Sequence, residues 1–281
     1  MTTGPVTTCH PLTLTRELED FPIGNLPLRG HHERLRASWP EVTIHVHAWI
    51  EPADLDCFYD TAVRTLTDAA GLPLAWMGEG PEPDAVQIAH ASFLIAYPWD
   101  ILRANEQFMA GMRESRIEGD LHPSAVVEGH LHLAAGARVL PGVYIEGHVI
   151  VGAGTKLGPN CYIRGSTAIG EHCHIGQAVE VKNSIILNKT SIGHLSYAGD
   201  SIIGEKVNFG AGTIISNFRH DGKNHHSMVH GELIDTGRRK FGAIIGDGVH
   251  TGIHTSIYCG RKLWPGTSTR PGAVVQRDVM D

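Results

Sequence analysis

Two cationic side chains near the middle of the chain are spaced so that they could bind an anion together. Arg164 and Lys182 are separated by three units of a six-residue repeat, and each directly follows an aliphatic residue of that repeat. If three repeats form one turn of a coiled chain, the two cations stand one above the other, about 5 Å apart. Stacked cations repel unless an anion or a carboxylate lies between them. The spacing therefore favours a phosphate clamp. The alternative is that both cations are ordinary surface residues that form ion pairs with carboxylates such as Glu180.

The repeat that positions these cations runs from Leu121 to Val181. A six-residue period matches neither the 3.6-residue period of a helix nor the simple alternation of a strand. It is typical of a parallel β-helix, in which each unit contributes one short strand and one corner. The sequence therefore predicts a mainly β fold with a narrow, three-sided core. Its inward aliphatic positions are Leu121, Val127, Leu133, Val139, Ile145, Val151, Leu157, Ile163, Ile169, Ile175 and Val181.

The repeat becomes irregular after Val181. Two five-residue steps follow, and a long charged and histidine-rich loop, residues 216–243, then interrupts the pattern before six-residue spacing returns. Three units per turn give about seven coils in total. A loop of this length on an otherwise regular rod is typical of a functional segment. This loop carries three consecutive cations, Arg238, Arg239 and Lys240.

The first part of the chain lacks the repeat. Residues 1–116 are expected to form a small α/β cap domain, and residues 117–281 the β-helix domain. Within the cap, helices are expected from Pro52 to about Ala70 and from Pro98 to about Glu114 because both begin with proline and continue with helical spacing of apolar residues. Strands are expected over 43–50, 73–77 and 86–97.

Composition and charge exclude several classes of function. Residues 1–117 hold 16 acidic residues, eight arginines and no lysine, so their net charge is −8, whereas residues 118–281 are close to neutral at +1. No broad basic face is indicated, so nucleic-acid binding is not expected. No run approaches the length of a membrane span, and the start lacks a signal-peptide pattern. The five cysteines contain no CxxC spacing and are expected to be free thiols, which indicates the cytoplasm.

Several stretches of the second half resemble one family of acyltransferases. They are similar to the acetyltransferase domain of the bifunctional N-acetylglucosamine-1-phosphate uridylyltransferase, and more closely to its archaeal-type relatives, sugar-1-phosphate nucleotidylyltransferases with a fused acetyltransferase. The resemblance covers roughly residues 97–281 and implies left-handed coiling and a homotrimer with active sites between neighbouring subunits. It also implies acylation of the amine of an amino-sugar phosphate by acetyl-CoA or another acyl-CoA. The stretches are VEVKN at 179–183, GHLSYAGDSIIG at 193–204, NFGAGTIISNF at 208–218, GRRKFGAIIGD at 237–247 and PGAVVQRDV at 271–279.

The resemblance assigns roles to seven residues of this sequence. His194 matches the general base that takes a proton from the attacking amine, and Asn208 matches a residue beside it. Histidine suits this role because its pKa is near neutral. The other five match residues that hold the substrate, with the cations binding the sugar phosphate: Arg164, Lys182, Lys240, Tyr197 and Asn217. This chemistry requires no metal.

The sequence also departs from the family pattern. Phe218 stands where the bacterial enzymes have tyrosine, and Ile253 replaces a serine on the acyl-donor side. The chain ends at Asp281, before the C-terminal arm that completes the coenzyme A site of the bacterial enzymes. The front half is too short for a nucleotidyltransferase domain and has no Gly-rich loop with Arg and Lys, so no nucleotidyl transfer is expected.

Two other functions compete with acyl transfer. Rods of this kind also include trimeric zinc hydratases of the carbonic anhydrase type, which need three imidazoles from two neighbouring chains. His220, His225 and His230 could supply such ligands together with His194. The third possibility is a non-catalytic trimeric scaffold whose cap binds a partner.

Overall fold

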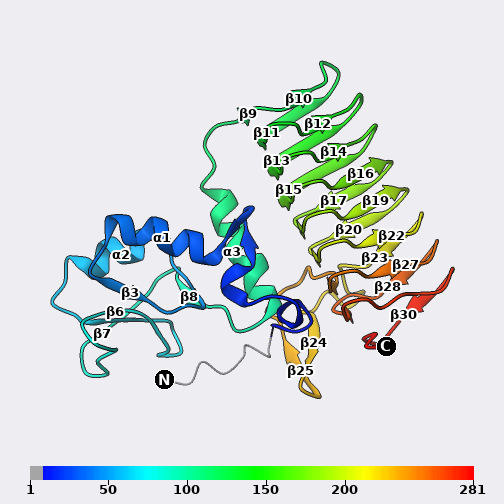
Figure 1. The fold of residues 1–281 in the computed structure, drawn as a ribbon. Coiled ribbons are helices and arrows are strands. Elements are labelled where there is room, and N and C mark those ends of the chain that lie inside the picture. The colour runs from blue at the N-terminus through cyan, green and yellow to red at the C-terminus, as the bar shows by residue number, and fades with distance from the viewer. Residues whose placement is uncertain (1–8) are drawn as a thin grey trace.

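The computed structural model describes residues 9–281, which form a cap packed against the side of a long β-helical rod (Figure 1). The rod has three walls of parallel strands that repeat along its length. One wall is a separate seven-stranded sheet, and the other two are joined because their early strands bend around a corner. The mainly β fold is confirmed, and the rod is consistent with left-handed coiling.

The first wall contains one strand from each of seven successive coils. At the start its strands pair across three full six-residue repeats, as in Lys156 with His174, and later the separation is one residue shorter, as in His174 with Ser191. In order they are β10 (Asp120–Leu121), β12 (Arg138–Val139), β14 (Lys156–Leu157), β16 (His174–Gln177), β19 (Ser191–His194), β22 (Asn208–Phe209) and β27 (His250–Thr251).

The second and third walls share three long strands that each cross a corner. These are β11 (Val126–Leu133), β13 (Tyr144–Val151) and β15 (Tyr162–Ile169). The second wall continues through β17 (Glu180–Lys182), β20 (Tyr197–Gly199), β23 (Ile214–Ile215), β28 (Ser256–Ile257) and β30 (Val274–Val275). The third wall begins with β9 (Arg116–Ile117) and continues through β18 (Ile185–Ile186), β21 (Ile202–Ile203), β26 (Ile244–Ile245) and β29 (Lys262–Leu263).

The inward aliphatic residues form the core of the rod, as the repeat predicted. From Leu133 to Val181 every predicted inward aliphatic residue is at most 2% exposed. The two five-residue steps shorten the coils after Val181 by one residue each, so β15 pairs with β18 through Ala168 and Ile185. Register is therefore kept although the spacing changes.

The cap consists of short helices and strands. Its helical elements are η2 (Leu12–Leu14), η3 (Leu18–Asp20), α1 (Leu28–Ser38), α2 (Pro52–Tyr59) and α3 (Pro98–Ala110). A four-stranded sheet in the order β3-β6-β5-β7 is formed by β3 (Val42–Ile44), β6 (Pro73–Met77), β5 (Thr65–Thr67) and β7 (Val86–Ile88). Two antiparallel pairs complete the cap, β1 (Pro22–Ile23) with β2 (Leu26–Pro27) and β4 (Ala48–Trp49) with β8 (Phe93–Leu94).

Sequence patterns predicted the cap only in part. The strand over 73–77 and the helix starting at Pro98 are confirmed. The helix expected to reach Ala70 is wrong beyond Tyr59, because Thr65–Thr67 joins the sheet as β5 and buries its side chains there. The strand expected over 86–97 is two short strands, and α1 was not predicted.

The cap covers the third wall of the rod. The outward side chains of Ile185, Ile202 and Ile244 are at most 1% exposed and belong to the same apolar cluster as Phe21 and Trp99 of the cap. An apolar outer wall needs such a cover, and the cap provides it. The two parts of the chain therefore share one core in addition to the core of the rod.

The long loop over residues 216–243 has internal structure. Its middle forms an antiparallel hairpin of β24 (His226–Val229) and β25 (Glu232–Asp235), and its two ends meet where Phe218 bridges to Lys240. Val229 and Phe241 enter the core shared with the cap. All five cysteines are free, and no helix among residues 9–281 is long and apolar enough to cross a bilayer.

Candidate active site on the second wall

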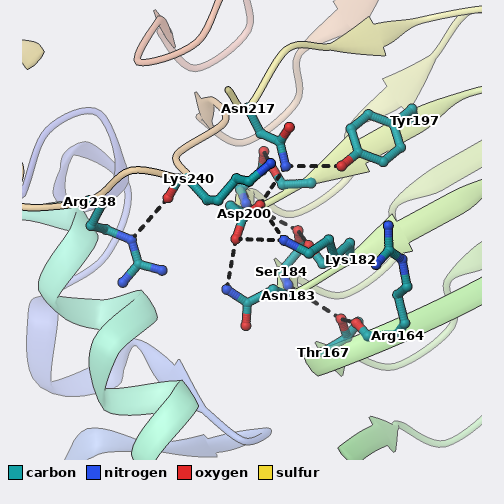
Figure 2. A network of polar contacts seen from close by, with 12 residues as sticks. Arg164, Thr167, Lys182, Asn183, Ser184, Tyr197, Asp200, Asn217, Arg238 and Lys240 are labelled. Atoms are coloured by element: carbon teal, nitrogen blue, oxygen red, sulfur yellow. Dashed lines mark hydrogen bonds and ion pairs between the residues drawn. The ribbon is translucent and has the colours of Figure 1, made fainter. Parts of the chain in front are cut away.

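Arg164 and Lys182 stack on the second wall as their spacing predicted. They are direct neighbours in the pairing of β15 with β17. Each cation is paired with a carboxylate. Arg164 donates to Glu180 from Nε at 2.9 Å. The Lys182 ammonium lies 3.0 Å from Asp200 (Figure 2). Carboxylates therefore relieve the repulsion in this structure, which is the alternative that the sequence left open.

Asp200 is the centre of the polar network on this wall. Its side chain is 3% exposed and accepts hydrogen bonds from Lys182, from Asn183 at 3.0 Å and from Asn217 at 2.5 Å. Sequence reasoning missed this residue. The shortening of the coils by one residue was the available signal, since it places Asp200 directly above Asn183 at successive corners, where both adopt a left-handed backbone with φ of 50° and 48°.

Tyr197 and Asn217 form the next part of the network. The Asn217 amide donates to the Tyr197 hydroxyl at 2.9 Å as well as to Asp200. Burial raises the pKa of Tyr197, and the nearby carboxylates of Asp200 and Glu180 raise it further, so the phenol stays protonated. Gly199 makes room for this pair, because a Cβ there would lie 2.3 Å from the Tyr197 hydroxyl oxygen.

Lys240 enters the site from the end of the long loop. Its ammonium lies 4.1 Å from the centre of the Phe218 ring, a cation–π contact. The phenylalanine that replaces a family tyrosine therefore still contacts a substrate-binding candidate, through its ring face instead of a hydroxyl. The Lys240 backbone bridges to Phe218, and the N–H of the next residue, Phe241, donates to the Asn217 carbonyl at 3.0 Å, so Lys240 is drawn with the network in Figure 2.

Helix α3 of the cap reaches the same network through Glu106. Its carboxylate accepts a hydrogen bond from Asn183 at 2.6 Å and forms an ion pair with Arg238. Asn183 directly follows Lys182, and Arg238 also donates from Nε to the carbonyl of Lys240 at 3.4 Å. The cap thus contacts Asn183, next to Lys182 in the chain, and Arg238, two residues before Lys240.

His194 and Asn208 lie apart from this network, on the first wall. His194 ends β19 at the corner that leads to the second wall, and Asn208 begins β22 in the next coil. Both side chains are exposed, and within the described part of the chain neither forms a hydrogen bond or ion pair with the network around Asp200. Five of the seven candidate residues therefore come together in one chain, and these two do not join them.

The histidine-rich loop does not assemble a metal site within one chain. Among residues 9–281 no group of three metal-binding side chains is close enough to hold an ion. His225 is 1% exposed, and its Nε2 lies 3.1 Å from the carbonyl oxygen of Asn217. Burial lowers the pKa of this imidazole, so it is a neutral core residue that fixes the loop beside Asn217.

Comparison with known proteins places the similarity in the repeat region. The family described as GMPPB C-terminal domain matches residues 145–261. A bifunctional sugar-1-phosphate nucleotidylyltransferase/acetyltransferase of Sulfurisphaera tokodaii is 43% identical over 185 residues, which are 66% of this chain and 46% of the relative. A bifunctional protein GlmU of Methanococcus maripaludis strain C7 is 48% identical over 185 residues, 66% of this chain and 44% of the relative.

These relatives confirm the resemblance seen in the sequence motifs. The chain spans about half the length of the curated relatives it matches. Among solved structures, a putative acetyltransferase of Bacillus cereus is similar with a TM-score of 0.32 and 19% identity, covering 56% of this chain and 85% of the other. PerB of Caulobacter crescentus, in complex with CoA and GDP-perosamine, has a TM-score of 0.23 and 16% identity over 66% of this chain and 63% of the other.

Proposed function

We propose that the protein is an acyl-CoA-dependent N-acyltransferase that transfers an acetyl group to the amine of an amino-sugar phosphate. The observation that carries the proposal is the cluster on the second wall, which combines three cations, a phenol and an amide (Figure 2). The 43% identity to a relative named as a nucleotidylyltransferase/acetyltransferase supports the same reaction.

The three cations are proposed to bind the substrate phosphate. Lys182 and Arg164 are stacked, and Lys240 reaches the site from the loop. Cationic side chains on one surface suit a phosphate because charge-assisted hydrogen bonds to its oxygens are strong. Since Glu180 and Asp200 already pair with two of them, a bound phosphate shares these cations with the carboxylates, which fixes its position. A held phosphate orients the amine for attack.

His194 is proposed to take the proton of the attacking amine. The amine nitrogen bonds to the thioester carbonyl carbon, the C–S bond breaks, and coenzyme A leaves as a thiol that receives the proton. Asn208 is proposed to assist beside His194, where an amide N–H can stabilise charge that develops on the carbonyl oxygen. No metal takes part in this scheme.

The separation of His194 from the cation cluster leads to a proposed assembly. A homotrimer would join the first wall of one chain to the second wall of its neighbour, and each active site would combine both groups. Exposed apolar side chains at Leu195, Ile214 and Ile253 support contact between copies along these two walls. The site is incomplete in one chain, and we place the working trimer in the cytoplasm.

The proposal is tested by incubating the protein with acetyl-CoA and glucosamine 1-phosphate and measuring the release of free thiol. We expect turnover that His194→Ala reduces by at least about a hundredfold, since general bases contribute at least that factor. The control is His122→Ala, a histidine of the first coil whose ring hydrogen-bonds to Ser124. An unchanged rate in the His194 variant contradicts the proposed base.

Four further measurements separate the competing functions. Stoichiometric zinc in the purified protein, with hydratase activity, would replace this proposal by the carbonic anhydrase type. Absence of turnover with a panel of amino-sugar phosphates and acyl-CoA donors would favour the scaffold. A monomer in light scattering would contradict the shared site. Incubation with UTP and a sugar 1-phosphate is expected to release no pyrophosphate.

A further inference from the structure

A pocket of about 580 Å³ lies between the cap and the start of the rod, away from the cation cluster. It is bounded by α1, by the segment joining β4 to α2, by the end of α3 and by the chain that leads into the rod. This volume is in the range of pockets that bind small organic ligands. None of the seven candidate active-site residues lines it.

Aromatic rings form one side of this pocket. The His31 ring contacts Trp49 and Phe108 edge to face, with centroids 5.0 and 4.9 Å apart. Leu35 and Met112 add apolar surface beside them. Burial lowers the pKa of His31 to about 4, so the imidazole is neutral and this side of the pocket carries no charge. Such a surface suits a flat aromatic group.

Arginines line the mouth of the pocket. Arg34, Arg113 and Arg116 are exposed there, and none of them forms an ion pair within residues 9–281. One guanidinium nitrogen of Arg113 donates to the carbonyls of Ala110 and Met112. They are three of only eight arginines in the acidic first 117 residues. Two carboxylates, Glu51 and Glu114, also line the pocket, so the cations remain in excess. Arginines without a carboxylate partner on one rim are suited to a phosphate or carboxylate.

Gln107 lines the same pocket and has a hydrogen-bond acceptor that is not used. Its Nε2 donates to the carbonyl of Ala91 at 3.3 Å, which leaves Oε1 free of that contact. This oxygen is buried and has no hydrogen-bond partner in the described chain. A buried acceptor without a partner costs stability, so a rotation of this partly buried side chain that turned Oε1 toward a ligand N–H in the pocket would be favourable.

We propose that this pocket binds a nucleotide. The rings would stack against the base, Gln107 Oε1 would accept a base N–H, and the arginines of the rim would bind the phosphate. An aromatic ring, an N–H donor and a terminal anion occur together in a nucleoside phosphate, whereas a simple sugar phosphate has neither the ring nor the base N–H. A second pocket of about 440 Å³ shares Arg116 and His132 with the first and extends the polar side, which gives room for a sugar or a second phosphate.

The test is isothermal titration calorimetry of the whole protein with AMP, GMP, CMP and UMP. Two controls are titrated in parallel: ribose 5-phosphate, which lacks the base, and the free nucleosides, which lack the phosphate. We expect at least one nucleotide to bind about tenfold more tightly than either of its parts. Equal binding of ribose 5-phosphate would reduce the site to an anion patch and overturn the proposal, as would the absence of binding by all four nucleotides.

Variants locate the binding in this pocket. Arg113→Ala combined with Arg116→Ala should weaken the phosphate-dependent part by about tenfold or more, and Gln107→Leu should weaken nucleotides while leaving ribose 5-phosphate unchanged. The control is Arg36→Ala, an exposed arginine of α1 that does not line the pocket. Equal affinities in the pocket variants and the control would place the nucleotide elsewhere and overturn the proposal. Thiol release with acetyl-CoA, without nucleotide, should be unaffected by the arginine variants.

Discussion

Neutralising Asp200 should destabilise the protein far more than neutralising Glu180, although each carboxylate pairs with one of the two stacked cations. Asp200 is 3% exposed and accepts from Lys182, Asn183 and Asn217. Removing one partner of a buried ion pair leaves a charge and polar groups without compensation, which costs roughly 3–5 kcal/mol. The Lys182 side chain is 23% exposed and regains some hydration, so we expect about 3 kcal/mol for Asp200→Asn.

Glu180 provides the matched comparison because its pair is open to water. The side chains of Arg164 and Glu180 are each 33% exposed, and such ion pairs contribute at most about 1 kcal/mol. Urea unfolding of Asp200→Asn and Glu180→Gln, at one fixed protomer concentration, measures both changes, since any association of copies adds to the apparent stability. Equal losses in the two variants would refute the argument that burial, and not the mere presence of the pair, determines the effect.

Three other properties can be tested on the same footing. Burial lowers the pKa of His31 to about 4 from about 6.5 in the unfolded chain, so the unfolded state binds more protons between these values. The free energy of unfolding should therefore fall by up to about 3 kcal/mol as the pH drops through this window, and His31→Gln should flatten the urea-unfolding profile between pH 7 and pH 4. Gly176→Ala should prevent soluble folding because its Cβ would lie 1.9 Å from the carbonyl oxygen of Gly193, whereas Gly193→Ala meets nothing within 4 Å and should leave the melting temperature nearly unchanged. Glu106→Gln should raise KM for the phosphorylated acceptor about threefold with kcat nearly constant, since it weakens the hold on Arg238 without touching the proposed base; a change confined to kcat would contradict this role.

The rod could be predicted from the sequence because its core repeats. Each inward side chain meets the equivalent residue of the next coil, so periodicity alone determines which residues are buried and which stack. For this reason the spacing of Arg164 and Lys182 was enough to place them side by side, and they are neighbours in the pairing of β15 with β17. The two five-residue steps preserve this relation, since each shortens one coil by a single residue on all three walls, and the 18-residue separation returns after the long loop.

Contacts between distant segments could not be predicted in the same way. The repeat could have identified Asp200, because the shortened coil places this residue next to Asn183. Glu106 was not, because its contact with Asn183 spans 77 residues and depends on how α3 packs against the third wall. Short strands of the cap were missed for a related reason: Thr65–Thr67 continues a helical pattern in sequence, but its pairing with β6 and β7 determines its conformation.

The position of the cap connects its structural role with the proposed chemistry. The third wall carries Ile185, Ile202 and Ile244 on its outer face, and cap residues, including those of α3, cover these side chains. With α3 held on that wall, Glu106 reaches the corner where the second wall ends and contacts Asn183 and Arg238. The same packing that buries the apolar wall thus fixes the chain beside two of the candidate phosphate-binding cations. Among residues 9–281 the cap packs on the third wall, and it is the first and second walls that carry the two separated halves of the proposed active site.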